Sequence, residues 1–199
     1  MANANGERAC VFGGFFYTGC QQKPTNSLRW LAPGSLILFG SHFGRSEQAA
    51  FVVDTVFVVR DHVDHNAQVF RTVLERSVPS EYFTTTLEPW YWGESDSPID
   101  DLGYRLYRGA TREQPIGGMF SFFPAVPSTG QQAGFGRPQI QHQVISNGMS
   151  QGYKLTAMTM EGVTRVWRDV REQVLAAGLW LGTAAVMPTQ PDLDAMRVG

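Results

Sequence analysis

The stretch FVVDTVFVV, residues Phe51–Val59, is the strongest secondary-structure signal in the chain and decides its fold class. Every position except Asp54 holds valine, phenylalanine or threonine, the β-branched and aromatic residues that strands prefer. A nearly continuous apolar run is typical of a strand that is covered on both faces. Asp54 and Thr55 interrupt the run, so we expect one of them to make a specific hydrogen bond.

Shorter strand signals lie on both sides of this run. The expected strands are Ala9–Thr18, Ser35–Phe39, Tyr82–Leu87, Leu102–Tyr107 and Gly118–Phe123. Residues 88–101, rich in acids and prolines, are expected to form a long loop. The sequence therefore predicts an α+β fold with a mainly antiparallel curved sheet or a small β-barrel.

Two segments carry the helical period instead. Between Asn66 and Arg76 the apolar residues recur at helical spacing, which predicts a short helix with Asp64 or Asn66 as its cap. A long amphipathic helix is expected to begin at the N-cap Thr159 and to end near Gly178. Its apolar stripe is Val163, Val166, Trp167, Val170, Val174 and Leu175, with Arg165, Arg168, Asp169 and Glu172 opposite.

The composition is that of a packed protein. Of 199 residues, 43% are hydrophobic and 17% are charged. We expect a single globular domain over residues 1–199, with an ordered core over 8–187, a flexible loop near 124–138 and a loose C-terminal tail. The net charge of −2 provides no global positive field toward duplex nucleic acid, but it leaves room for a local basic groove.

The cysteines and the apolar runs bear on the compartment. Cys10 and Cys20 are too few for a secreted disulfide framework. No apolar stretch approaches the ~20 residues that cross a bilayer, and the polar N-terminus has no signal-peptide core. These features predict a cytoplasmic protein without a membrane partner.

The densest polar cluster, residues 61–66, follows the strongest strand directly. His62, Asp64 and His65 are candidate catalytic residues there, because the end of a strand presents a general base well. A metal site needs further ligands at fixed spacing, and the remaining histidines, His42 and His142, stand alone. We therefore expect no metal and no cofactor.

Candidate ligand-binding residues lie in two other segments. Ser41, His42 and Arg45 lie between two expected strands and combine a hydroxyl, an imidazole and a guanidinium that can hydrogen-bond a base or a phosphate. Trp90 and Trp92 form the densest aromatic patch outside the strands. The acids around them repel phosphate and favour an isolated base over a backbone track.

Arg137 is a further ligand-binding candidate, at the end of a segment rich in glycine, glutamine and proline. The segment lacks the lysine and the hydroxyl residue of a phosphate-binding loop. The planar fork of Arg137 can still bind a phosphate, so we expect this segment to contact a ligand.

The segment Leu31–Gly40, followed by Phe51–Phe57, resembles a pattern in the PUA-like domains, which include the EVE and YTH groups. In that pattern a turn ending in glycine and a small polar residue leads into an apolar strand, and a second strand follows. The resemblance implies a small β-barrel that holds a nucleobase, often a modified one, in an aromatic-lined pocket.

The segment Leu106–Ala110 is similar to the first motif of arginine-type ADP-ribosyltransferases, and this similarity implies that Arg108 grips NAD. Phe120–Phe122 follows where that family has a Ser-Thr-Ser strand. The family also needs a Glu-x-Glu after these motifs, and none occurs here. The missing catalytic motif disfavours this interpretation.

The leading functional hypothesis is a binding module for a nucleobase, a nucleotide or nucleic acid, linked to nucleic-acid modification or defence. One alternative is an enzyme acting on a nucleotide or NAD through His62, Asp64, His65 and Arg108. Another is a structural or interaction protein without a small-molecule site. Salt dependence separates the first hypothesis from the others, because phosphate contacts weaken as the salt concentration rises.

Overall fold

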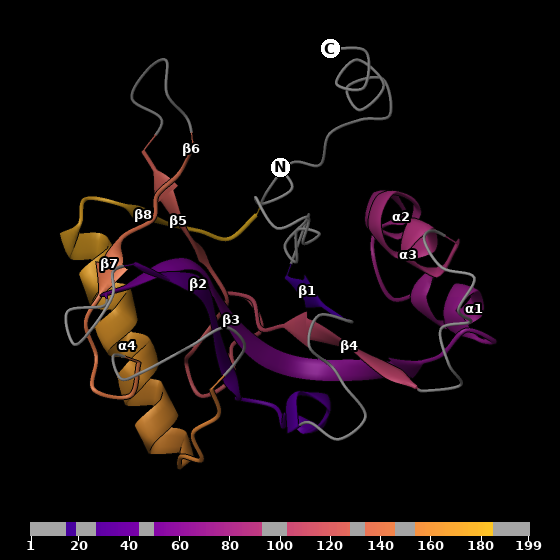
Figure 1. The fold of residues 1–199 in the computed structure, drawn as a ribbon, viewed down its shortest axis with the longest axis horizontal. Helices are drawn as coiled ribbons and strands as arrows, with labels where there is room; N and C mark the ends of the chain where they lie inside the picture. Colours follow the sequence, from indigo (N-terminus) through magenta and orange to yellow (C-terminus); the bar gives the residue numbers. More distant parts are fainter. Residues whose placement is uncertain are drawn as a thin grey trace.

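A computed structural model of the chain describes residues 15–18, 27–43, 50–92, 103–127, 134–145 and 154–184. Within these residues, one long strand connects two ends of different character (Figure 1). The α-helix α4 lies at one end, and the short helices α1 to α3 lie at the other. The strand between them is β3 (Ala50–His65), which contains the run that dominates the sequence.

The main sheet is antiparallel and has five strands. Its order is β1-β4-β3-β2, and β7 pairs with the beginning of β3. The first half of β3 pairs with β2, and its second half pairs with β4. The partner strands are β1 (Phe16–Tyr17), β2 (Leu36–Phe43), β4 (Tyr104–Gly109) and β7 (Gln139–Ile140).

A smaller antiparallel sheet has the order β6-β5-β8. Its strands are β5 (Phe123–Val126), β6 (Gly134–Phe135) and β8 (Trp180–Gly182). A bridge between Val56 and Phe122 joins this region to β3. The fold is therefore α+β with antiparallel sheets, as the sequence predicts, but the described strands do not close into a barrel.

Two irregularities in β3 explain its nearly continuous apolar run. The register with β2 shifts beside Asp54, and the register with β4 shifts at Arg60. An extra residue at a bulge reverses the alternation of side chains between the two faces. As a result Val53 and Val56 lie in one core cluster, whereas Phe57 lies in another on the opposite face. The expectation of a strand covered on both faces is confirmed, because Val53 and all residues from Val56 to Val59 are completely buried.

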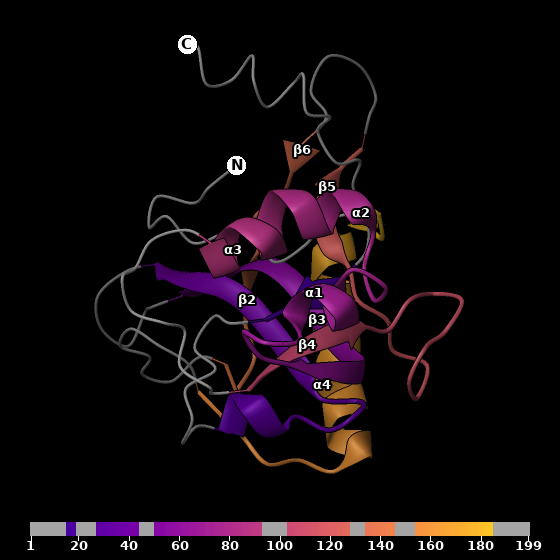
Figure 2. The ribbon, with the colours of Figure 1, turned by 90° about the vertical axis from the view of Figure 1, so that its right-hand side faces the viewer.

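Short helical segments cover the end of the main sheet where β3 meets β4 (Figure 2). They are α1 (Phe70–Leu74), α2 (Ser80–Tyr82), the π-helical segment η2 (Phe83–Leu87) and α3 (Glu88–Trp92). Their apolar side chains bury Leu106 of β4 in a separate core cluster. Before α1, the side chain of Asn66 accepts hydrogen bonds from the backbone amides of residues 68 and 69. The N-cap of α1 is Val69, which makes no side-chain capping bond, so the predicted cap at Asp64 or Asn66 is wrong and Asn66 instead stabilises the turn that precedes the helix.

The predicted strand Tyr82–Leu87 is wrong, and so is the predicted loop at its start, because α3 occupies residues 88–92. Three consecutive threonines gave this segment a strand-like composition. Packing decides otherwise: Tyr82, Phe83 and Leu87 are all buried against α1 and β4, on one helical face. The hydroxyls of Thr84 and Thr85 donate to backbone carbonyls one turn earlier, as hydroxyl residues within helices commonly do.

Helix α4 (Met160–Ala176) has the predicted boundaries. The Thr159 hydroxyl accepts a hydrogen bond from the amide of Gly162 at 3.2 Å, and Gly178 follows the helix with a φ of 75°. The predicted stripe packs against the first half of β3, since Val166, Trp167, Val170 and Val174 are buried in the core cluster that contains Val53. The last member of the stripe, Leu175, is exposed.

Other predictions are met in part or lie outside the described residues. The expected strand over 118–123 is instead a tight turn closed by the Ile116–Met119 bridge, after which β5 begins at Phe123. The first part of the expected strand 9–18, both cysteines, residues 128–133 and the C-terminal tail are not among the described residues. No helix among the described residues is long and apolar enough to cross a membrane.

Candidate functional site

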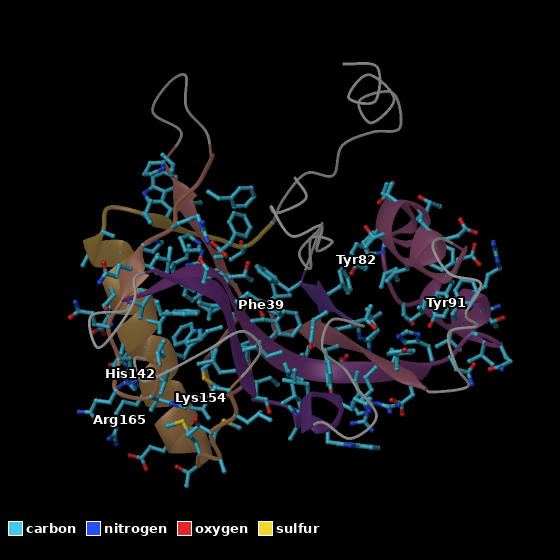
Figure 3. The ribbon with its side chains drawn as sticks, in the orientation of Figure 1. Phe39, Tyr82, Tyr91, His142, Lys154 and Arg165 are labelled. Atoms are coloured by element: carbon cyan, nitrogen blue, oxygen red, sulfur yellow. The ribbon has the colours of Figure 1, made fainter. Side chains whose placement is uncertain are left out.

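His65, a candidate catalytic residue, is at the end of β3 and is only 2% exposed. Its Nε2 lies 3.0 Å from the Thr18 hydroxyl, its Nδ1 shares a hydrogen bond with the Tyr91 hydroxyl, and its ring stacks on Tyr104. Burial lowers the pKa of His65 to about 4, against the opposing effect of the Asp64 charge. The imidazole is therefore neutral near pH 7, and through Tyr91 and Tyr104 it connects helix α3 to the sheet. Tyr91 lies among the short helices, at the end of the molecule away from α4 (Figure 3).

His62 and Asp64 share one face of β3, because residues two apart in a strand point to the same side. His62 Nε2 lies 3.8 Å from Asp64 Oδ1, and Arg105 Nε donates to the same oxygen at 2.9 Å. The ring of His62 also lies edge-on to Tyr107. His65 points to the other face, so the predicted cluster is divided between the two sides of the strand.

Arg108, the fourth catalytic candidate, is engaged by Asp61. Arg108 Nε donates to Asp61 Oδ1 at 2.5 Å, and Arg60 donates to the other carboxylate oxygen at 3.0 Å. Burial raises the pKa of Asp61, but the hydrogen bonds and charges of the two arginines outweigh it and keep that pKa below its usual value. No group of three possible metal ligands occurs among the described residues.

Ser41 and Arg137, two of the predicted ligand-binding residues, lie side by side although they are far apart in the sequence. Arg137 donates two hydrogen bonds to Asp54, at 2.5 and 3.1 Å, and a third to the Ser41 hydroxyl at 2.8 Å. The bond to Asp54 raises the pKa of Arg137. The hydrogen bond expected at Asp54 or Thr55 is therefore made by Asp54, at the bulge, and it occupies the planar fork of Arg137.

The remaining ligand-binding candidates are placed only in part. His42 lies in β2 opposite Phe51, and Trp90 and Trp92 lie in α3, but the side chains of these three candidates are outside the described part of the structure. Arg45 is also outside it. Their roles stay predictions.

Six of the arginines that the structure describes form an ion pair with a carboxylate. The ion pairs are Arg60 and Arg108 with Asp61, Arg71 with Glu88, Arg105 with Asp64, Arg137 with Asp54 and Arg165 with Glu161. Three arginines beside α4 differ, namely Arg112, Arg168 and Arg171. No acidic side chain among the described residues forms an ion pair with any of these three, although the charge of Arg112 lowers the pKa of the neighbouring Glu113.

Two of these arginines border an open groove of about 560 Å³, which we call the α4 groove. It is lined by Arg112, Gly118, Phe120, Trp167, Arg171, Leu175, Trp180 and Leu181. The groove therefore combines aromatic rings, apolar side chains and two unpaired cations.

The base of the α4 groove is formed by packed aromatic side chains. Trp167 is buried, and its indole N–H donates to the carbonyl of Phe120 at 2.9 Å. The rings of Phe120 and Trp167 pack edge to face with centroids 5.2 Å apart. Arg112 Cζ lies 5.2 Å from the Phe120 ring centroid, and Arg171 Cζ lies 5.9 Å from that of Trp167. Each guanidinium is thus held over an aromatic face, as in cation–π pairs.

The other end of the α4 groove is formed by Trp180, which is 63% exposed. It begins β8, directly after the turn at Gly178 that ends α4. A large aromatic side chain left exposed beside two unpaired cations is the feature that sequence reasoning missed. The signal was weak, because Arg112 and Phe120 lie between β4 and β5 whereas Trp180 lies in β8, and only the fold brings these two segments together.

Comparison with known proteins adds no further constraint on the function. No protein-family model, no curated protein and no solved structure significantly matches this chain.

Proposed function

We propose that this protein is a binding module for a nucleobase or nucleotide, and that the α4 groove is its site. The observation that carries the proposal is the pair of unpaired arginines, Arg112 and Arg171, in a groove that also exposes Trp180. A nucleotide presents a flat aromatic ring and an anion, and the groove offers a partner for each.

The exposed ring of Trp180 supports the stacking of a base. Stacking of a base on an aromatic side chain contributes about 1–3 kcal/mol and tolerates any base, because every base has a π face. Leu175 and Leu181 extend the apolar surface beside Trp180. Discrimination between bases would then depend on the hydrogen-bonding groups at the rim.

The two guanidinium groups support the binding of a phosphate. Arginine binds phosphate through two parallel N–H···O bonds, and its planar group is pre-organised when it lies on an aromatic ring. Arg112 and Arg171 are held in this way over Phe120 and Trp167. A phosphate that binds here does not have to displace a carboxylate, whereas one that binds Arg137 has to displace Asp54.

The proposal keeps the ligand class that the PUA-like resemblance implies and assigns a different surface to it. In the sequence-based prediction Trp90 and Trp92 stack on the base, and Arg45 and Arg137 contact the phosphate. The groove instead uses Trp180 with Arg112 and Arg171. The two assignments predict different sensitive residues, so mutagenesis distinguishes them.

The test is an equilibrium titration of the purified protein with AMP, ADP, ATP and the corresponding guanine nucleotides, followed by calorimetry. Trp180→Ala should weaken binding at least about fivefold, the lower limit for the loss of one stacked base. Trp30→Ala is the matched control, because Trp30 is 64% exposed and also lies under a guanidinium, that of Arg105 at 4.6 Å.

Equal affinity of Trp180→Ala and the wild-type protein would contradict the assigned site. Absence of binding by every nucleotide would contradict the proposed function as a whole. A loss with Trp30→Ala in place of Trp180→Ala would move the stacking site to the face of the sheet that carries Arg105.

A further inference from the structure

We infer that the ligand of the α4 groove is a single strand of nucleic acid that extends beyond one nucleotide and lies along α4. The inference rests on the proposed function and specifies its ligand. Its basis is a second groove, of about 400 Å³, beside the same helix. This second groove is lined by Gly117, Met160, Glu161, Thr164, Arg165 and Arg168.

The two grooves share one face of α4. The helical residues that line them are Met160, Glu161, Thr164, Arg165, Trp167, Arg168, Arg171 and Leu175. Most of these follow one another at steps of three or four residues, which places them on one side of a helix. From Met160 to Leu175 this face spans about 22 Å at 1.5 Å per residue.

A tight turn separates the grooves without placing a side chain between them. Ile116 and Met119 close the turn with two backbone hydrogen bonds of 2.9 Å. The residues between them, Gly117 and Gly118, both have positive φ, at 57° and 79°, as a two-residue hairpin turn of this type requires. Gly117 lines the second groove and Gly118 the α4 groove, so a chain can cross the turn close to its backbone.

The charges along this face favour a polyanion. Arg112, Arg168 and Arg171 have no carboxylate partner among the described residues. Arg168 lines the second groove and Arg171 lines the α4 groove. Because these two arginines are one helical turn apart, the two grooves adjoin along the helix. At the far end Arg165 pairs with Glu161 at 3.3 Å, so the positive section ends there. The lining of the two grooves carries four arginines and one glutamate, whereas α4 as a whole carries three arginines and three acids, Glu161, Asp169 and Glu172.

A single strand fits this surface better than a duplex. Trp180 can stack only on a base whose face is accessible, and bases within a duplex already stack on one another. A stacked strand advances about 3.4 Å per nucleotide, so the ~22 Å face accommodates at most about six nucleotides. Three arginines correspond to about three neutralised phosphates.

The experiment is a fluorescence-anisotropy titration with labelled oligothymidylates of two to twelve nucleotides. Affinity should rise with length and level off at about six nucleotides, the length of the face. For the hexamer, the plot of log affinity against log salt should have a slope of about −2, which is −0.7 for each of three phosphates. An unlabelled duplex of equal length should compete more weakly than the single strand.

Arg168→Gln tests the junction between the grooves. It should reduce the magnitude of the salt slope for the hexamer by about 0.7 and weaken the hexamer more than a mononucleotide. Arg76→Gln is the matched control, since Arg76 is an exposed arginine that follows α1, at the other end of the molecule. It should leave the slope and the affinities unchanged.

If the dinucleotide and the dodecamer bind with equal affinity and mononucleotides still bind, the inference that the ligand is a longer single strand is wrong, whereas the proposed function stands. Tighter binding of the duplex would also overturn the inference. If neither mononucleotides nor oligonucleotides bind, the proposed function itself is wrong.

Discussion

The two ends of the molecule use their charged residues differently. Where β3 meets β4, Asp61 lies between Arg60 and Arg108, and Asp64 accepts a hydrogen bond from Arg105. Beside α4, Arg112, Arg168 and Arg171 form no ion pair with an acid among the described residues, although the charge of Arg112 acts on the neighbouring Glu113. The arginines of β3 and β4 are therefore paired with carboxylates, whereas these three arginines are not.

This difference shows why density of polar residues is a poor guide to a binding site here. The cluster over residues 61–66 is the densest in the sequence, yet its side chains are engaged by neighbouring strands. A ligand that binds there has to compete with existing partners. The α4 groove looks ordinary in the sequence, because its cations lie far apart in the chain and become neighbours only after folding.

The largest expected effect is at His65. Replacement by alanine removes a buried ring and leaves the partly buried Tyr91 hydroxyl without one of its partners. We expect the free energy of unfolding to fall by about 2–4 kcal/mol, measured by urea denaturation. His62→Ala, at a half-exposed position on the same strand, should cost less than about 1 kcal/mol. Equal costs for the two variants would contradict the structural role assigned to His65.

The second prediction concerns pH. The pKa of His65 is about 4 in the folded protein and close to 6.5 when the chain is unfolded, so the unfolded state binds more protons between these values. The contribution of His65 to the free energy of unfolding is therefore fully present above pH 6.5. It decreases as the pH falls toward 4, by up to about 3 kcal/mol. His65→Gln should flatten this part of the stability profile. An unchanged slope in the variant would show that other groups cause it.

The third prediction compares an arginine of α4, Arg171, with an arginine of β4, Arg108. Arg171→Gln should weaken nucleotide binding about tenfold, because it removes a charge-assisted hydrogen bond to phosphate, and should leave stability within about 0.5 kcal/mol. Arg108→Gln should do the opposite, with a stability loss of about 1 kcal/mol and unchanged binding, since its partner is Asp61. Calorimetric titration measures the nucleotide affinity of both variants, and urea denaturation measures their free energy of unfolding. The reverse pattern would place the site on β4.

The smallest effect is expected at Arg137. Its ion pair with Asp54 is exposed, so Arg137→Gln should cost less than about 1 kcal/mol despite the good geometry. The same variant should bind nucleotides like the wild-type protein. A loss of binding would instead support the loop site predicted from the sequence, and titration with ADP distinguishes the two results.

Local features of the chain were predictable. The strand around Phe57 and the helix after Thr159 follow from a continuous apolar run and from a capped amphipathic stripe, and both patterns lie within a short window. The helical segment after Tyr82 was not predictable in this way, because three threonines favour a strand and only burial against α1 and β4 overrides them.

The candidate site was less predictable than the fold. Ser41 and Arg137 were chosen separately and do lie together, but their common partner Asp54 depends on a bulge in strand pairing that no local pattern encodes. Arg112 precedes β5 and Trp180 follows α4, yet both line the α4 groove, so their neighbourhood is a property of the tertiary structure. Whether an arginine is already neutralised is likewise visible only after folding.

The most direct measurement compares the affinity for ADP of the wild-type protein with that of the double variant Arg112→Gln/Arg171→Gln. The account predicts a loss of about thirtyfold or more, from two charge-assisted contacts that weaken together, with an unchanged free energy of unfolding. If the double variant binds ADP as tightly as the wild-type protein, the unpaired arginines of the α4 groove are not a binding site.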